Sequence, residues 1–478
     1  MIGLAGGALG LALAVWDLNI IRSSIPLMIY RMVAGLKDMR VNGEVAAFDV
    51  AASLVASFLC CLPVAFHAMR SRAAVGPNDV LKEGGRTSSA SPSRSRLRTV
   101  LVVAEVALAF VLLVGAGLMV GTLQKFVKVN VGYDPHNVLT ADITLSGNAY
   151  EKPSRITGFY EDLLRNLTQT QTIEGVAAVG ELGSAQSVLI EGRPPSRPGE
   201  TRPEIRTTTA QYLRAMWIPL LKGRWISEQD GPDRLHVVVL SASVARQYWP
   251  TSNPIGERIK LGGSAAAWLT VVGVAGDVND WFTGEPMPMA YVSHRQFPQA
   301  SMQVLVRGRH NSRELAGSLR QAAEALDREQ PVYNVHTLEQ QMYEEMSGIR
   351  NAARMMTMYA VIALLLAVTG IYSISSFFVT ERTREIGVRM SLGATRQTIL
   401  KMVLSQSCTL TGIGLLIGVP AALGLTIGMS RALYNVVAIE PIAFALFIAV
   451  LGGAALVAGY VPAYRAAKVD PVVALRHE

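Results

Sequence analysis

The sequence has few charged residues and few of the motifs that carry catalysis. Asp, Glu, Lys and Arg make up 17% of its 478 residues, below the roughly one quarter of an average soluble chain, while hydrophobic residues make up 50%. No GxxxxGK[ST] phosphate loop and no HExxH metal motif occurs, and the residues around Ser184 do not match GxSxG. The sequence therefore predicts a chain that is not an enzyme and that has no catalytic, cofactor or metal site of its own.

The sequence has three cysteines, and each lies in an apolar stretch. Cys60, Cys61 and Cys408 all lie inside hydrophobic runs, so the sequence indicates neither a disulfide framework nor a CxxC metal site. They are expected to be buried small side chains.

Long apolar runs are what the sequence has instead. Most of them approach the roughly 20 residues that a membrane-spanning helix needs. They are Met1–Trp16, Val50–Met69, Thr99–Gln124, Met355–Thr380, Met402–Ser430 and Pro441–Tyr464. We therefore expect an α-helical membrane protein with about six transmembrane helices, the first of them short.

The positive charge is placed beside these runs. The formal net charge is +8, but no basic stripe is interleaved with aromatic residues, which argues against a nucleic-acid partner and favours membrane lipid. Residues 70–98 carry seven Lys or Arg against two acidic residues, and the turn 431–440 carries one Arg. The first segment is therefore expected inside and the second outside. This orientation places 125–350 outside and 381–401 inside, although the external turn 17–46, with four basic residues, departs from the rule.

The region between the third and fourth runs has the pattern of a water-soluble α/β domain. The stretch at 235–249, LHVVVLSASVARQYW, predicts a buried strand followed by a helix, and WLTVVGVAGDV at 268–278 predicts another strand. The segments RITGFYEDLLRNLTQT and SRELAGSLRQAAEALDRE have the spacing of amphipathic helices, the second with Asn311 or Ser312 as its N-cap. Its roughly 200 residues suffice for a core of its own.

Small and acidic residues inside the apolar runs indicate helix contacts and one candidate site. The spacing of Gly414 with Gly418, and of Gly424 with Gly428, predicts close contacts between helices, as does GLAGGALG near the start. Glu105 lies within the third run, where a carboxylate is costly and marks a functional candidate. The alternative is that it lies near enough to the inner surface to meet Arg98 or water.

A charged stretch between two apolar runs raises the clearest question about function. ERTREIGVRMSLGATRQTIL, Glu381–Leu400, mixes charges with the aliphatic residues Ile386, Val388, Leu392 and Ile399. It predicts a short amphipathic helix at the membrane surface, interrupted at Gly393. Its composition fits either a solvated loop facing lipid or a helix that docks a partner.

Three parts of the sequence resemble the signature of the FtsX-like, MacB-type ABC transporter permeases. They are this charged stretch, the pair of apolar runs after it and the terminal PAYRAAKVDPVVALRHE. Three further stretches resemble segments of the periplasmic core domain of that family. They are YLRAMWIPLLKGRWISEQD, QYWPTSNPIGERIKLGG and TVVGVAGDVNDWFTGEPMPMAYV. The piece that ends in NDVLKEGGR resembles the close of the first half in the duplicated orphan permease branch. We therefore expect the C-terminal portion of a longer parent.

The resemblance implies a fold and a domain plan. The expected fold is the membrane helices with an inserted periplasmic α/β domain like that of MacB. The expected segments are the end of a first FtsX-like module (1–83), a cytoplasmic linker (84–96), the first helix and stalk of a second module (97–126), the periplasmic domain (127–345), and an FtsX-like module with its coupling loop at 381–401 (346–478).

The resemblance also implies a docking site. Glu385, Gly387, Arg389, Gly393 and Ala394 fall on the family's coupling-helix positions, and Glu381 and Arg384 complete the expected contact with a cytoplasmic ABC ATPase subunit. ATP would be bound by that separate subunit.

The function implied is mechanotransmission in the bacterial inner membrane. ATP hydrolysis would move two stalk helices, 97–130 and 339–380, so that the periplasmic domain expels or extracts a substrate. A second module would take part, either in a homodimer or by pairing within the full-length parent. The alternative is a membrane scaffold that controls a periplasmic partner, with or without an ATPase.

Overall fold

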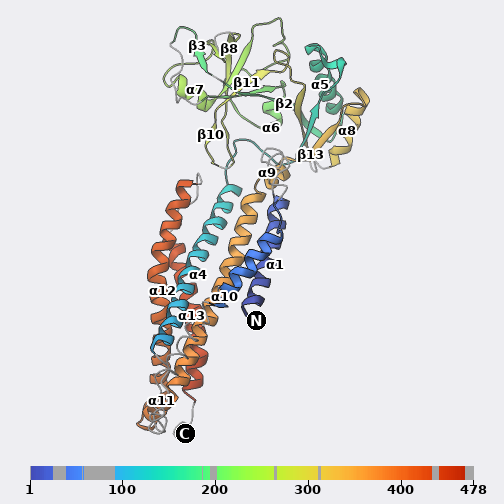
Figure 1. Cartoon of the computed structure of the whole chain (residues 1–478). Helices are drawn as coiled ribbons and strands as arrows, with labels where there is room; N and C mark the ends of the chain where they lie inside the picture. Colours follow the sequence, from blue (N-terminus) through green and yellow to red (C-terminus); the bar gives the residue numbers. More distant parts are fainter. Residues whose placement is uncertain are drawn as a thin grey trace. The chain divides into compact units, whose positions relative to one another are not determined.

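The computed structural model describes residues 2–24, 39–55, 57–58, 92–185, 187–193, 202–262, 266–281, 283–309, 314–432 and 441–468. The chain divides into two compact units. One, here called the helical unit, comprises Met1–Lys125 and Met346–Glu478, and the other, the α/β domain, comprises Phe126–Glu345 (Figure 1).

Apolar sequence forms long helices in the helical unit. They are α1 (Ile2–Ser24), α4 (Pro92–Val127), α10 (Ser347–Glu381), α12 (Arg396–Ala432) and α13 (Pro441–Ala466), with the short α11 (Thr383–Ser391) between α10 and α12. Five helices of the described chain are long and apolar enough to cross a membrane, which agrees with the expectation of about six. The remaining candidate, Val50–Met69, lies mostly outside the described residues, as do the linker Gly84–Ser95 up to its last few residues and the end of the chain after Lys468.

The first helix differs from its prediction. The apolar run ends at Trp16, but α1 continues to Ser24, because the polar residues after Trp16 are compatible with further helical turns. The expected turn at 17–46 therefore begins too early. Gly3 and Gly7 of this helix lie against Ser57 and Ser53, so the predicted close contact is present.

A shared apolar core joins α4, α10, α12 and α13, which run side by side in Figure 1. The glycines of α12 explain part of this contact. A Cβ on Gly414 would lie 2.5 Å from Val106 Cγ1 of α4, so only glycine lets the two helices approach this closely. Gly418 likewise faces Ala107, but Gly424 and Gly428 have no atom of the described chain within 4 Å of the Cβ position, and their predicted contact is not found there.

The α/β domain is built on one large mixed sheet. Its strands are β1 (Val138–Thr144), β2 (Ile173–Ser184), β3 (Val188–Ile190), β4 (Glu204–Thr208), β5 (Leu220–Gly223), β6 (Val237–Ser241), β7 (Arg258–Leu261), β8 (Leu269–Ala275), β11 (Met289–Ser293), β12 (Ser301–Gly308) and β13 (Val332–Thr337). Their order is β13-β1-β12-β2-β4-β11-β6-β8-β7-β3, with β5 beside β8. Among the described strands, only β4 with β11 and β6 with β8 pair in parallel. Strands β9 (Val278–Asn279) and β10 (Pro286–Met287) form a separate small ribbon.

Helices cover this sheet and confirm the sequence-based pattern. They are η2 (Asn148–Tyr150), α5 (Pro153–Thr168), α6 (Tyr212–Met216), α7 (Ala242–Tyr248), α8 (Leu315–Leu326) and α9 (Leu338–Glu345). The predicted strand and helix at 235–249 are β6 and α7, and the two amphipathic segments are α5 and α8. The proposed N-cap residues Asn311 and Ser312 lie outside the described residues.

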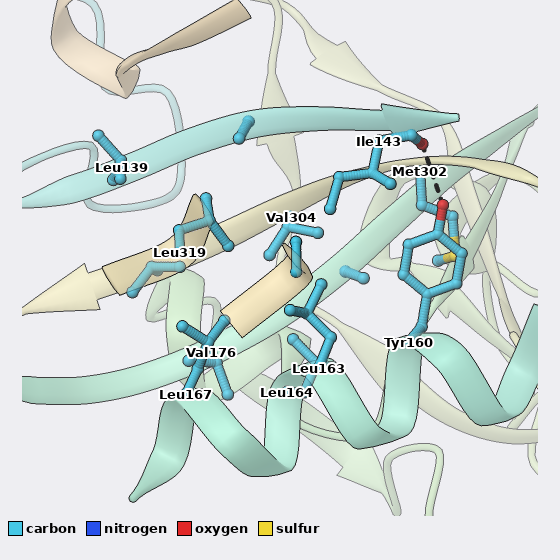
Figure 2. Close-up of a cluster of buried hydrophobic side chains, with 14 of the residues drawn as sticks. Leu139, Ile143, Tyr160, Leu163, Leu164, Leu167, Val176, Met302, Val304 and Leu319 are labelled. Atoms are coloured by element: carbon cyan, nitrogen blue, oxygen red, sulfur yellow. Dashed lines mark hydrogen bonds between the residues drawn. The ribbon is translucent and has the colours of Figure 1, made fainter. Parts of the chain in front are cut away.

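One apolar core lies where α5 and α8 pack on β1, β12 and β2 (Figure 2). Its leucines come from one face of α5 because apolar residues recur there every three or four positions. The buried Tyr160 hydroxyl donates a hydrogen bond of 3.0 Å to the Ile143 carbonyl, so its polar end is satisfied inside the core.

The first and last segments of the α/β domain are fastened to each other. His136 Nδ1 lies 2.5 Å from Glu339 Oε1 on α9, and Asn279 contacts the incoming chain through the Asn130 and Val131 carbonyls. The second expected stalk, 339–380, is not one helix, because α9 ends at Glu345 and α10 begins at Ser347. Met346 between them has ψ −2°, away from the helical value.

Candidate functional site: the charged helix between α10 and α12

The charged stretch forms a separate helix because the backbone turns at both of its ends. Helix α10 ends at Glu381, and Arg382, with φ −107° and ψ 18°, departs from helical geometry before α11 begins. Gly393 then takes φ +94°, a conformation that side chains with a Cβ rarely adopt. The Ala394 N–H bonds to the Arg389 carbonyl at 2.9 Å and closes the turn. The helix and its interruption at Gly393 are as predicted.

One face of α11 is buried in the helical unit. Ile386 is 1% exposed and packs with Ile399 of α12 and Ala466 of α13, while Met390 covers the same cluster. This small apolar core therefore holds α11 against two long helices. Burial of an isoleucine of this kind stabilises by about 2 kcal/mol.

The opposite face is exposed and partly apolar. Leu392 is 82% exposed and Val388 is 40% exposed. With Glu385 they follow the spacing i, i+3, i+7, so they lie along one side of the helix. The four aliphatic residues expected to act together are thus divided: Ile386 and Ile399 face inward, and Val388 and Leu392 face outward.

Charged side chains beside Leu392 are paired along the helix. Arg389 Nη2 donates to Glu385 Oε1 at 2.5 Å, and Arg389 Nη1 lies 3.0 Å from Met402 Sδ of α12. Arg382 lies 3.8 Å from the other Glu385 oxygen and stacks over Phe378. These contacts fix the side chains next to the exposed leucine, although each exposed pair adds only a few tenths of a kcal/mol.

The structure brings most of the predicted docking residues to one short segment. Glu381 is exposed at the end of α10, Glu385 and Arg389 are exposed on α11, Gly387 is buried in α11, and Gly393 and Ala394 form the turn; Arg384 lies within α11. The roles of Val388 and Leu392 were missed in the sequence. The signal was present, because a helical projection from Ile386 places both on the side of Glu385.

Glu105 is partly buried in the helical unit. A Cβ on Gly370 of α10 would be 2.6 Å from Glu105 Oε2, so the absence of a side chain at Gly370 leaves room for the carboxylate. The Arg98 guanidinium stacks over Phe377, 4.8 Å from the ring centroid. Both the functional role of Glu105 and the alternative of Arg98 or water as its partner stay predictions.

The described parts of the chain contain no cluster of side chains that could bind a metal ion. No three His, Cys, Asp or Glu side chains there are placed to hold a metal ion together. Five helices long and apolar enough to cross a membrane, a large α/β domain inserted between two of them and an amphipathic helix between two others define a multi-pass membrane protein.

Comparison with known proteins specifies this class. Residues 357–471 match the FtsX-like permease C-terminal domain, and residues 99–326 match the MacB-like periplasmic core domain. The chain belongs to the ABC transporter permeases that carry these two domains.

Similar proteins include permeases with and without an ATP-binding part in their names. The chain is 26% identical to the uncharacterized ABC transporter permease YknZ of Bacillus subtilis, over 76% of this chain and 94% of YknZ. It is 27% identical to the pyoverdine export ATP-binding/permease protein PvdT of Pseudomonas putida and 29% identical to the macrolide export ATP-binding/permease protein MacB of Bdellovibrio bacteriovorus. These two matches cover 76% and 54% of this chain but only 56% and 41% of the relatives.

Among solved structures, the periplasmic region of MacB from Actinobacillus actinomycetemcomitans is 19% identical, with a TM-score of 0.32, and the match covers 46% of this chain and 98% of that one. The extracellular domain of YknZ is 16% identical, with a TM-score of 0.29, over 41% of this chain and all of that domain.

Proposed function

We propose that this permease works with a separate cytoplasmic ATPase subunit and that α11 is the surface on which that subunit docks. The observation that carries the proposal is Leu392, 82% exposed beside Val388 on a helix whose other face is anchored. An exposed leucine framed by fixed charges has the make-up of an interface centre with a polar rim.

The contacts of the buried face of α11 indicate how a displacement of this helix would reach the long helices. Because Ile386 packs on Ile399 and Ala466, a displacement of α11 would carry α12 and α13 with it, and α10 follows through the short link at Arg382. Two docked states of the ATPase would then favour two states of the helices. We infer mechanotransmission to the α/β domain for the efflux or extraction of a substrate.

The proposal includes a location and further partners. The α/β domain would lie in the periplasm and α11 in the cytoplasm of a multi-pass protein of the bacterial inner membrane. ATP would be bound by the separate subunit, in keeping with the ATP-binding/permease names of relatives that this chain matches over about half their length. A second module, in a homodimer or a longer parent, would complete the permease.

The docking role is tested with the full chain in detergent and a panel of soluble ABC ATPase subunits from the source organism. We expect one subunit to bind, and Leu392→Asp to weaken its binding at least tenfold, because burial of a leucine is worth about 1.5–3 kcal/mol. Biolayer interferometry would measure both affinities. A thiol reagent that does not cross membranes should label Thr395→Cys only in opened cells.

A matched control separates docking from folding. Leu235→Asp changes another exposed leucine, 65% exposed in the α/β domain, and should leave ATPase binding unchanged. If no subunit binds a well-folded chain, or if Leu392→Asp binds as the unmodified chain does, the docking role is wrong. The scaffold without an ATPase would then be the better description.

A further inference from the structure

One side of the end of α13 carries an exposed row of apolar, aromatic and basic side chains. Val457, Tyr460, Tyr464 and Lys468 follow one another at spacings of three or four residues, so they lie along one side of the helix. Lys468 lies in the turn that continues α13, where its N–H bonds to the Arg465 carbonyl at 3.2 Å. Val457 is 68% exposed, Tyr460 51% and Tyr464 44%, and Lys468 is also exposed. The described chain therefore leaves this side of the helix uncovered.

The aromatic and basic members of this row contact one another. The rings of Tyr460 and Tyr464 stack, with their centroids 5.9 Å apart and an angle of 19° between their planes. Lys468 Nζ lies over the Tyr464 ring, 4.5 Å from its centroid. Attraction between the ammonium group and the ring holds the Lys468 charge beside the tyrosine pair.

A second cation comes from the neighbouring helix. Arg396, the first residue of α12, lies near enough for the charge of its guanidinium to act on the Tyr464 hydroxyl. Arg396 is exposed, and among the described residues neither Arg396 nor Lys468 forms a salt bridge with an acidic side chain. Two cations from neighbouring helices therefore create a positive potential around the Tyr464 hydroxyl.

The length of α13 places this cluster at a membrane surface. The helix has 26 residues, which at about 1.5 Å per residue amounts to roughly 39 Å. The hydrocarbon core of a bilayer is about 30 Å thick, so the ends of the helix reach the headgroup layers. Tyr464 lies near the last residue of α13, and Arg396 begins α12. Tyrosine together with lysine or arginine is typical of this level in membrane proteins.

We propose that Lys468, Arg396 and Tyr464 bind the phosphate group of an anionic phospholipid, and we call these three residues the α13 lipid site. The ammonium and guanidinium groups would pair with the phosphate, and the Tyr464 hydroxyl would donate to it. The acyl chains would lie along Val457 and Tyr460. These two exposed side chains favour a lipid over an acidic polypeptide, because they continue the site toward the hydrocarbon core.

The α13 lipid site borders the small apolar core that holds α11. Ala466, between Tyr464 and Lys468 in the chain, packs with Ile386 of α11 and Ile399 of α12. A phosphate that pairs with Arg396 and Lys468 would join the ends of α12 and α13 beside this core. The bound lipid would thus restrain the two helices on which α11 rests.

Native mass spectrometry of the full chain in detergent tests the site. Phosphatidylglycerol, which is anionic, and phosphatidylcholine, which is zwitterionic, would be titrated with the same acyl chains, and their dissociation constants measured. We expect phosphatidylglycerol to bind at least about fivefold more tightly, because each basic residue near a membrane surface contributes about this factor toward an anionic lipid. Inorganic phosphate, which has the anion without the acyl chains, should not displace the lipid.

Two variants and a matched control locate the charge that is recognised. Lys468→Gln and Arg396→Gln should each weaken phosphatidylglycerol binding about fivefold and leave phosphatidylcholine binding unchanged. Lys401→Gln removes the same charge from another exposed position of α12, about 140° around the helix from Arg396, and should leave both affinities unchanged. All three side chains are exposed, so these variants keep the apolar core intact.

Photochemical cross-linking locates the lipid without any substitution. A phosphatidylglycerol with a diazirine in its headgroup should label peptides that contain Tyr464, Lys468 or Arg396. Labels spread evenly over the five long apolar helices would overturn the proposal.

The proposal is also wrong if the two lipids bind alike, if both glutamine variants at the site keep the affinity of the unmodified chain, or if inorganic phosphate displaces the lipid. The assay contains no ATPase and leaves α11 unchanged, so its outcome is independent of the docking role proposed above.

Discussion

Both terminal nitrogens of the Arg224 guanidinium donate hydrogen bonds to the Asp230 carboxylate, with Nη1–Oδ2 and Nη2–Oδ1 distances of 2.8 Å each. The Ser227 N–H donates to the same carboxylate at 2.8 Å. Burial raises the pKa of Asp230, but the bonds from Arg224 and Ser227 together outweigh it, so the pKa lies below its ordinary value. This pair, with Asp230 buried and Arg224 half exposed, fixes the turn after β5.

Acid should therefore destabilise the α/β domain partly through Asp230. A carboxyl group with a lowered pKa in the folded state contributes stability above the unfolded pKa, near 4, and that contribution is lost as the pH falls through the folded value. We expect Asp230→Asn to lower the free energy of unfolding at pH 7 by about 2 kcal/mol and to reduce its dependence on pH below 4. Tryptophan fluorescence during denaturant unfolding at pH 7 and pH 3 would measure both.

The control for Asp230→Asn is Asp162→Asn, at a surface pair with Arg165 in which the carboxylate is 51% exposed. This variant should change the unfolding free energy at pH 7 by less than about 0.5 kcal/mol. Equal effects of the two variants would contradict the role given to Asp230.

Arg307 should be the most sensitive arginine of the α/β domain. Its side chain is 3% exposed, its Nε donates to the Ala215 carbonyl at 2.6 Å, and its terminal nitrogens donate to the carbonyls of Asp134 and His136. Trp217, which adopts φ +56°, stacks on the guanidinium. Arg307→Met would leave these carbonyls without donors and should cost about 3–5 kcal/mol in unfolding free energy.

Chemical unfolding of the full chain in detergent would measure the Arg307→Met effect. Arg320→Met, at an exposed position of α8, is the matched control and should stay within about 0.5 kcal/mol of the unmodified chain. A loss of less than about 1 kcal/mol in unfolding free energy for Arg307→Met would show that the hydrogen bonds of Arg307 are not needed for the stability of the domain.

The glycines of α12 should differ in their tolerance of alanine. Gly414→Ala places a methyl group 2.5 Å from Val106 Cγ1 and 2.8 Å from Val106 Cβ, so α4 or α12 must shift, at a cost of about 1–3 kcal/mol. Gly424→Ala meets open space and should be neutral or slightly stabilising, because alanine favours the helix.

Thermal unfolding in detergent would compare the two α12 variants. We expect a lower midpoint for Gly414→Ala and an unchanged or higher midpoint for Gly424→Ala. The reverse order would mean that α4 and α12 do not meet at Gly414.

The sequence predicted those features that depend on neighbouring residues. Apolar length identified α4, α10, α12 and α13, and the alternation from strand to helix identified β6 and α7, because these elements form from local patterns. Gly393 could be recognised as the end of α11 for the same reason. The docking residues remain predictions, since no partner is present to contact them.

Features that depend on distant segments could not be predicted in this way. The pairing of β2 with β4, some thirty positions later, begins only at Val179, and hydropathy carries no information about strand register. The inward position of Ile386 depends on Ala466 at the far end of the module. The room for Glu105 likewise depends on Gly370, which belongs to another helix.

The contact between His136 and Glu339 has a consequence for how such permeases can change over time. A domain whose first and last segments are joined interrupts its host chain at a single place. It can therefore be inserted, removed or replaced by another domain as a cassette without redesign of the helices on either side. A chimaeric permease would have its natural junctions next to this pair of residues.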